Sequence, residues 1–264
     1  MTAQSQFSLE GRIALVTGGG RGIGAGIAQS LARSGADVIV ADYDATLAEE
    51  GAAAVRCLER RSASMVVDVR KPESVSALFE KIERDFGRLD VAVNNAGIVS
   101  LGSIEQLTVP QWDEVMAVNL RGVFLCTQAE VALMRRNKFG RIINTSSIAG
   151  KVGFPHLSHY SATKFAVVGF TNAVAKEVAT EGITVNALCP GIVATGMWRG
   201  DTGLSKAWAL PGETEEASWA RHQAAFLPQG VAQTPEDMGQ MVVYLACAPH
   251  VTGQALAVDG GFSL

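Results

Sequence analysis

Short apolar runs alternate with longer amphipathic segments along the whole chain. Continuously apolar runs are typical of strands buried on both faces of a sheet, and apolar positions at helical spacing are typical of helices packed on such a sheet. The runs predict seven strands, at residues 12–17, 37–41, 64–67, 89–93, 141–144, 183–188 and Ala255–Val258. Strand–helix alternation of this kind predicts an α/β fold: one doubly wound domain over residues 1–264, with a seven-stranded parallel sheet and helices on both faces.

The segment from residue 196 to residue 233 interrupts this alternation. It is irregular, mixes glycine and proline with charged residues, and carries Trp198, Trp208, Trp219 and Phe226. A long insertion after the sixth strand is either a working lid or a disordered loop. The aromatic residues favour a substrate lid at about 196–233.

Composition and charge narrow the functional classes. The chain has 264 residues, 48% hydrophobic and 18% charged, with a formal net charge of −4 and no basic stripe. This balance argues against a nucleic acid or an anionic membrane as partner. The four cysteines lack CxxC spacing, the N-terminus has no signal-peptide pattern, and no apolar run approaches the ~18 residues that span a bilayer. We therefore expect a cytoplasmic protein that needs no metal.

A glycine-rich turn follows the first strand, in the pattern Thr17-Gly18-x-x-x-Gly22-x-Gly24. Glycines between a strand and a helix let the backbone approach a pyrophosphate, which the helix N-terminus attracts. Asp42 ends the second strand, where a carboxylate can bind an adenosine ribose and repel a 2′-phosphate. The aspartate favours NAD, whereas Arg21 in the turn favours NADP. NAD is the preferred prediction.

Tyr160 and Lys164 are four residues apart, which on a helix places them on one face, one turn apart. A nearby ammonium stabilises phenolate and so lowers the pKa of a tyrosine from its usual value of about 10. Such a pair can serve as a general acid–base group. Taken alone, the pair is better explained as an ordinary pair of helix residues, so a catalytic role depends on the other motifs.

Taken together, the motifs resemble the short-chain dehydrogenase/reductase family, which has a Rossmann fold. The resemblance covers nearly the whole chain and rests on the glycine turn, Asn94-Asn95-Ala96-Gly97, Asn119, Ser147, Tyr160-x-x-x-Lys164 and Pro190-Gly191. It implies an NAD(P)-dependent oxidoreductase that interconverts a secondary alcohol and its ketone.

The resemblance also implies a role for each residue. Tyr160 would be the acid–base group, Lys164 would lower its pKa and bind the nicotinamide ribose, and Ser147 would polarise the substrate oxygen. Asn119 would connect Lys164 to solvent at a helix irregularity. The cofactor would be bound by Tyr160 and Lys164 and by Gly18, Arg21, Gly22, Ile23, Gly24, Asp42, Asp68, Val69, Asn95, Ala96, Gly97, Pro190, Gly191, Val193 and Thr195.

Substrate selection is expected from two regions, residues 149–158 and the lid. Ser147, Tyr160, Val152, Met197 and Trp198 are the candidate substrate-binding residues, in a largely apolar pocket. The stretch from residue 191 to residue 198 resembles that of polyol and vicinal-diol (sorbitol, butanediol, acetoin) dehydrogenases of the family, which makes a polyol or diol a candidate substrate. His156 and His159 are expected to face solvent.

Two other functions stay open at this stage. One is an NADPH-dependent 3-oxoacyl thioester reductase, favoured by Arg21 and disfavoured by Asp42. The other is a catalytically silent nucleotide-binding protein that acts as a redox sensor, which would be expected to lack Tyr160 or Lys164. Family members pair the helices near residues 112–137 and 158–180 between subunits, so the resemblance implies a homotetramer.

Overall fold

A computed structural model describes residues 7–264 of the chain. The expectation that the chain has no signal peptide concerns mainly residues 1–6, which lie outside the described part. Seven strands form one parallel sheet in the order β3-β2-β1-β4-β5-β6-β7, which confirms the predicted fold class. The strands are β1 (Ile13–Thr17), β2 (Asp37–Asp42), β3 (Ser62–Val66), β4 (Val91–Asn94), β5 (Gly140–Thr145), β6 (Ile183–Pro190) and β7 (Ala255–Val258).

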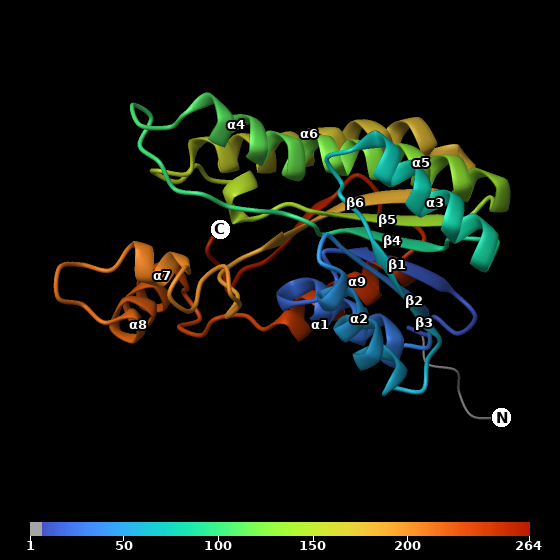
Figure 1. Cartoon of the computed structure of the whole chain (residues 1–264), viewed down its shortest axis with the longest axis horizontal. Helices are drawn as coiled ribbons and strands as arrows, with labels where there is room; N and C mark the ends of the chain where they lie inside the picture. The colour runs from blue at the N-terminus through green and yellow to red at the C-terminus, as the bar shows by residue number, and fades with distance from the viewer. Residues whose placement is uncertain (1–6) are drawn as a thin grey trace.

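Helices cover both faces of the sheet (Figure 1). One face packs against α1 (Gly22–Arg33), α2 (Ala45–Arg56) and α9 (Pro235–Cys247). The other face packs against α3 (Pro72–Phe86), α5 (Gly122–Asn137) and α6 (Ser158–Val178). The remaining helical segments are α4 (Val109–Met116), η1 (Ala117–Arg121), η2 (Ile148–Gly150), η3 (Ala179–Glu181), α7 (Leu204–Ala207) and α8 (Glu215–Phe226). No helix within residues 7–264 is long and apolar enough to cross a bilayer.

Helix boundaries follow local capping chemistry. The Asp44 carboxylate accepts hydrogen bonds from the backbone amides of Thr46 and Leu47, so α2 begins directly after it. The same helix ends at Arg56, and Glu59 then adopts a positive φ of 59° in the turn. Thr234 and Asp237 form a reciprocal capping box at the start of α9, with Pro235 in the first turn.

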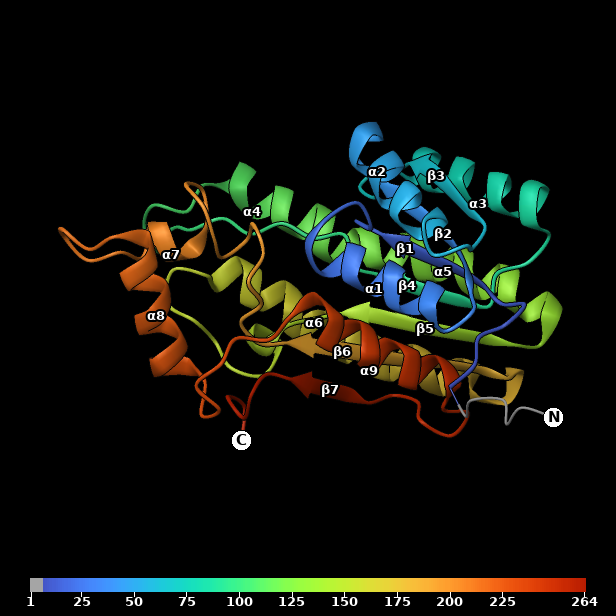
Figure 2. The same ribbon diagram turned by 90° about the horizontal axis from the view of Figure 1, so that it is seen from below.

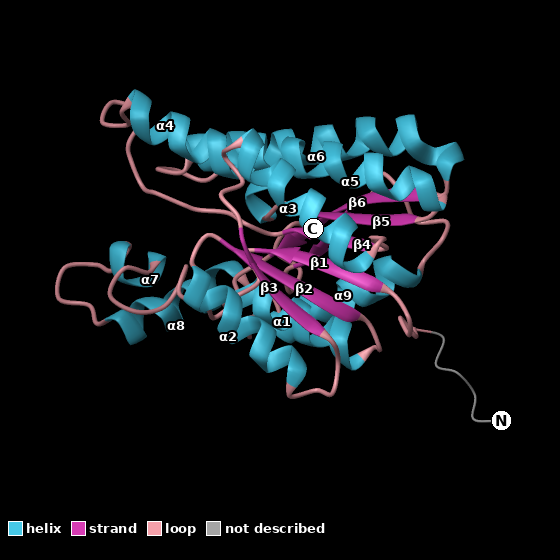
Figure 3. Cartoon of the chain, turned by 45° about the vertical axis from the view of Figure 1, so that its right-hand side comes forward, coloured by secondary structure: helices cyan, strands magenta, loops and turns pink. Residues whose placement is uncertain are grey.

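The segment between β6 and α9 extends beyond the end of the sheet where the strands terminate (Figure 2). It contains α7 and α8, so a part that was expected to be irregular is partly helical. The helix α4 extends past the same end of the sheet, as the view coloured by secondary structure also shows (Figure 3). The carboxyl ends of parallel strands are where open α/β sheets bind ligands.

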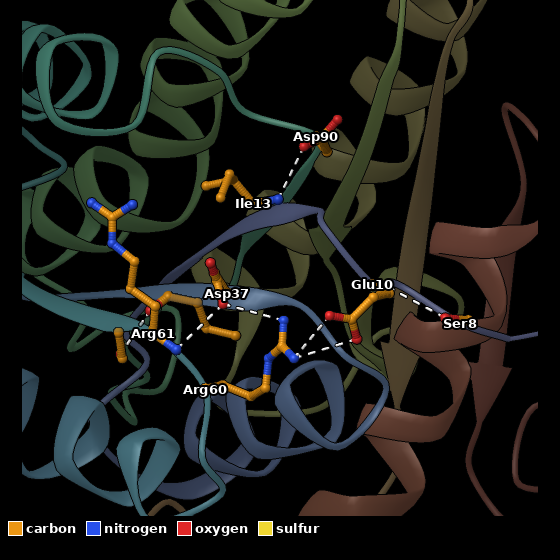
Figure 4. Close-up of polar contacts among 9 residues, drawn as sticks. Ser8, Glu10, Ile13, Asp37, Arg60, Arg61 and Asp90 are labelled. Atoms are coloured by element: carbon orange, nitrogen blue, oxygen red, sulfur yellow. Dashed lines mark hydrogen bonds and ion pairs between the residues drawn. The ribbon is translucent and has the colours of Figure 1, made fainter.

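Charged side chains stabilise the opposite end of the sheet, where the strands begin (Figure 4). Asp90 is fully buried, and its carboxylate accepts a hydrogen bond of 2.9 Å from the Ile13 amide. It also accepts one of 3.1 Å from Arg12 and another from Arg88. A second group joins the Arg60 guanidinium to Glu10 and Asp37 at 3.1 and 3.3 Å. Asp90 thereby couples β1 to the start of β4.

We expect Asp90→Ala to lower the free energy of unfolding by about 2–3 kcal/mol, because it removes charge-assisted hydrogen bonds and leaves a buried amide without its acceptor. Asp85→Ala is the matched control, since Asp85 pairs with Arg84 on the surface and should contribute less than about 0.5 kcal/mol. Urea denaturation measures both. Equal losses in the two variants would contradict the proposed coupling.

Candidate active site

The glycine turn between β1 and α1 leaves no space for side chains on its inner side. A Cβ on Gly24 would lie 2.0 Å from the Gly18 carbonyl oxygen, and one on Gly20 would lie 2.5 Å from the Leu47 backbone. Gly18 and Gly22 have positive φ values of 61° and 55°, which favour glycine. The N-cap Arg21 makes no side-chain capping bond, and the first turn of α1 holds no acid. The turn therefore fits a pyrophosphate at a helix N-terminus.

The adenosine end of the predicted site contains three charged side chains. Asp42 is buried, and its carboxylate accepts from the amides of Gly20 at 3.1 Å and Asp44 at 3.3 Å, so it borders the glycine turn. Arg21 is exposed and forms no ion pair within residues 7–264. The Asp68 carboxylate receives two hydrogen bonds of 2.8 Å from Arg70. These bonds orient the Asp68 side chain at the end of β3.

Tyr160 and Lys164 lie on α6 next to the carboxyl end of β5. The Lys164 ammonium donates to the Thr145 carbonyl oxygen at 2.9 Å and lies 5.5 Å from the centre of the Tyr160 ring. Ser147 follows β5, accepts a hydrogen bond of 3.0 Å from the Ala149 amide, and lies close enough to Tyr160 to lower the pKa of its phenol. The structure thus brings together the three residues predicted to carry the chemistry.

Burial dominates the acid–base properties of this cluster. It raises the pKa of Tyr160 to about 12, while the hydrogen bond from Ser147 lowers it. Burial also lowers the pKa of Lys164 to about 8. Both shifts favour the neutral form. The lowering of the Tyr160 pKa by Lys164 stays a prediction, and in the protein alone burial outweighs it.

Asn119 lies in η1, a π-helical turn between α4 and α5, so the structure has a helix irregularity at the expected place. Its amide group makes two hydrogen bonds of 2.9 Å with the backbone of Ile98, one as donor and one as acceptor. It also contacts the Thr163 hydroxyl at 3.4 Å. Gly97 lies between Asn119 and Lys164, since a Cβ there would be 3.5 Å from the amide oxygen and 3.7 Å from the ammonium.

The residues after β4 support the glycine turn. The Asn95 side chain donates to the carbonyl oxygens of Thr17 and Gly18, and the Ala96 amide donates to the Thr17 hydroxyl. Asn94 is buried and donates to Asn144 on the neighbouring strand. The Asn-Asn-Ala-Gly motif therefore joins β1, β4 and β5 at their carboxyl ends.

A cleft of about 780 Å³, including its open mouth, extends along this end of the sheet. Its lining contains predicted cofactor residues (Ile23, Asn95, Gly97, Tyr160, Lys164, Pro190, Gly191, Val193 and Thr195), predicted substrate residues (Ser147, Met197 and Trp198) and further residues that include Val99, Phe154, Leu157, Leu204 and Trp208. Val99 and Leu204 escaped the sequence analysis, because only the chain path brings them here. Gly18, Arg21, Gly22, Gly24, Asp42, Asp68, Val69 and Ala96 lie outside this lining.

Two expectations about side-chain exposure need correction. Val152 is 44% exposed and does not line the cleft, because it follows the short η2 turn and points outward. His159 does not face solvent: it is fully buried on α6, where its Nε2 lies 2.8 Å from the Ser100 hydroxyl. His156 is exposed as expected. The described residues 7–264 contain no group of three or more potential metal ligands.

Comparison with known proteins identifies the class. The chain matches the family model for short chain dehydrogenase over residues 12–203. It is 38% identical to a 2-(S)-hydroxypropyl-CoM dehydrogenase of Xanthobacter autotrophicus, over 97% of this chain and 98% of the relative. It is also 38% identical to a 3-oxoacyl-(acyl-carrier-protein) reductase of Haemophilus influenzae, over 97% of this chain and all of that one.

A solved structure of similar fold is a short-chain type dehydrogenase/reductase from Mycobacterium marinum, with a TM-score of 0.88, 30% identity and 98% coverage of both chains. The protein therefore belongs to the short-chain dehydrogenase/reductase family, as its motifs predicted. It is an oxidoreductase that acts on CH–OH groups, and its family uses NAD(H) or NADP(H).

The raised pKa of Tyr160 predicts a late phenol titration. The chain has three tyrosines, of which Tyr43 and Tyr244 are exposed. At about pH 11, below its pKa of about 12, the Tyr160 phenol should be mostly neutral and add little phenolate absorbance. Tyr160→Phe should therefore leave the phenolate absorbance of the protein nearly unchanged at this pH. Circular dichroism at the same pH controls for unfolding; a clear loss of phenolate absorbance in Tyr160→Phe would contradict the shift.

Proposed function

We propose that the protein is an NAD-dependent oxidoreductase that interconverts a secondary alcohol and its ketone, with Tyr160 as the general acid–base group. The single observation that carries this proposal is the position of the Tyr160 side chain. It lies beside Ser147, its ring centre is 5.5 Å from the buried Lys164 ammonium, and it lines the same cleft as the residues predicted to bind nicotinamide. A hydroxyl pair of this kind can hold a carbonyl oxygen and deliver a proton to it.

Each residue of the site has its own role in the proposed reaction. When bound, the dinucleotide donates or accepts the hydride. In ketone reduction, Ser147 donates a hydrogen bond to the substrate oxygen and Tyr160 transfers its phenolic proton to that oxygen. In alcohol oxidation, the proton moves in the opposite direction. Lys164, held by the Thr145 carbonyl, stabilises the phenolate. Asn119 holds the Ile98 backbone by two hydrogen bonds.

The cofactor preference rests on Asp42. Its carboxylate borders the glycine turn and accepts from the Gly20 amide, so a negative charge lies at the expected ribose site. A 2′-phosphate there would be repelled, which supports NAD over NADP. Gly18, Gly22 and Gly24 would accommodate the pyrophosphate, and Asp68 and Val69 would border the adenine. Arg21 is exposed and is the residue that could reverse this preference.

The alternatives differ in what they require. A 3-oxoacyl thioester reductase is the activity named for several relatives, and it would use the same Tyr160 chemistry on a longer substrate. A silent redox sensor would bind the dinucleotide without turnover, and the assembled Tyr160–Ser147–Lys164 cluster argues against it. We also propose that residues 1–264 form one domain with a lid at about 196–233, and that the protein is a cytoplasmic homotetramer.

Tyr160→Phe should reduce kcat for alcohol oxidation by about a hundredfold or more, because the proton acceptor is lost while the ring packing is kept. The Kd for NADH, measured by fluorescence, should stay within about twofold of the wild-type value. Tyr244→Phe, on α9, is the control and should have wild-type kinetics. If Tyr160→Phe retains full turnover, Tyr160 is not the acid–base group.

Asp42→Asn should shift the cofactor preference toward NADP. The asparagine oxygen can still accept from the Gly20 amide, so the variant removes the charge with little change in shape. We expect the ratio of kcat/KM with NAD to that with NADP to fall at least about tenfold. Arg21→Gln is the companion variant and should weaken activity with NADP alone. A wild-type enzyme that prefers NADP would overturn this part of the proposal.

A further inference from the structure

Two parts of the chain supply apolar side chains to the substrate end of the cleft. The lid supplies an aromatic wall of Trp198 and Trp208, together with Met197 and Leu204. The same lining contains Val99, Phe154 and Leu157, which come from the loop after β4 and from the approach to α6, and Trp208 packs against the same cluster. The Phe154 ring is stacked on Phe262 at 5.6 Å and lies edge-on to Phe226 of α8 at 6.0 Å. A flat apolar group in this part of the cleft would have aromatic neighbours from both parts of the chain.

The lining offers little to a charged or strongly polar substrate. Among the described residues it contains no acid, and its one basic residue, Lys164, is bonded to Thr145. The Asn95 amide is bonded to backbone carbonyls, and the Ser146 hydroxyl donates to the Lys164 carbonyl. A carboxylate in the apolar part would lose water without gaining a charged partner, and an additional hydroxyl would find only the indole N–H groups of Trp198 and Trp208 there, which is unfavourable.

The tryptophans of the lid have different roles. Trp219 is buried and packs against Ile192 in the interior of the lid. Trp198 and Trp208 are only partly buried and line the cleft, with their ring centres 5.7 Å apart in an edge-to-face arrangement. The His222 ring lies behind both, at 5.9 and 5.6 Å. Aromatic groups prefer such edge-to-face neighbours at 4.5–7 Å over aliphatic ones.

Ion pairs within the lid fix this aromatic wall. Arg221 on α8 donates to the Trp208 carbonyl oxygen at 2.9 Å and pairs with Glu213 at 2.8 Å. Arg199, next to Trp198, pairs with Glu215 through two hydrogen bonds of 2.9 and 3.2 Å. Both tryptophan backbones are therefore anchored to α8. Arg221 is a positioning residue, since it acts through Trp208.

We propose that the larger substituent of the substrate is a neutral aromatic ring, bound in the apolar part of the cleft that Trp198, Trp208 and Phe154 line. The inference rests on the proposed alcohol–ketone activity and names its substrate class: an aryl-substituted secondary alcohol or ketone. The same lining argues against the polyol or diol that residues 191–198 suggested.

Binding of ketones in the presence of NAD tests the class without turnover, because both partners are then oxidised and no hydride can move. Calorimetry should give a Kd for acetophenone about two- to tenfold lower than for cyclohexyl methyl ketone, which has a similar size but no aromatic ring. The para-carboxylate of acetophenone and acetoin should each bind at least about tenfold more weakly than acetophenone. A preference for any of these three ligands overturns the proposal.

Substitutions test which residues cause the preference for acetophenone. Trp208→Leu should abolish the preference for acetophenone over its cyclohexyl analogue, whereas Trp208→Phe should retain it. Trp112→Phe, on exposed α4, is the matched control and should bind every ligand as the wild type does. Arg221→Gln should raise the KM for acetophenone about threefold and leave kcat and KM for propanone unchanged. A loss with both ketones would show that Arg221 supports only the fold.

The two proposals fail in different ways. Full turnover by Tyr160→Phe would remove the proposed acid–base role and leave the ligand preferences as they are. Activity that depends on Tyr160 but is confined to acyl thioesters, polyols or charged ketones would keep the reaction and overturn the aromatic substrate class. A wild-type preference for acetophenone that survives Trp208→Leu would also overturn the binding site proposed here.

Discussion

The site depends on how one buried ammonium is satisfied. Lys164 is almost completely buried, and its donor contact to the Thr145 carbonyl oxygen uses the last residue of β5. That bond fixes α6 against the end of the strand, and the Ser146 hydroxyl adds a second link to the Lys164 carbonyl. Ser147 comes directly after Ser146 in the chain, and its side chain lies beside Tyr160. One strand end thus sets the distances among all three polar groups.

Burial also disfavours the charged forms of Tyr160 and Lys164. A phenol pKa raised from 10 to about 12 means that phenolate is disfavoured by about 3 kcal/mol relative to a solvated tyrosine. The hydrogen bond from Ser147 opposes this, and so would any positive charge brought beside the phenol. A neutral tyrosine is a proton donor, as the proposed reduction requires. The proposed oxidation would require that the bound reactants or a higher pH compensate for burial.

The sequence was sufficient for the features that depend on local pattern. All seven strands, the glycine turn, the position of Asp42 and the Tyr160–Lys164 pair were predicted, because buried strands and helical spacing leave a direct signal. Exposure was harder to predict. His159 is buried by the loop carrying Ser100, which is distant in sequence, and Val152 turns outward although Ala149 and Phe154 line the cleft. Such outcomes depend on tertiary contacts and not on periodicity.

The proposed lid is held by its own contacts, which are separate from those that hold Tyr160. Its ion pairs, Arg199 with Glu215 and Arg221 with Glu213, and its packing of Trp219 and His222 lie within the segment itself. The acid–base cluster, by contrast, is held by β5, α6 and the π-helical turn at Asn119. A substitution in the lid can therefore change the shape of the apolar wall while the distances around Tyr160 stay fixed. The family motifs lie mainly among the contacts around Tyr160, so family membership indicates the reaction class. The choice of substrate depends instead on the contacts within the proposed lid.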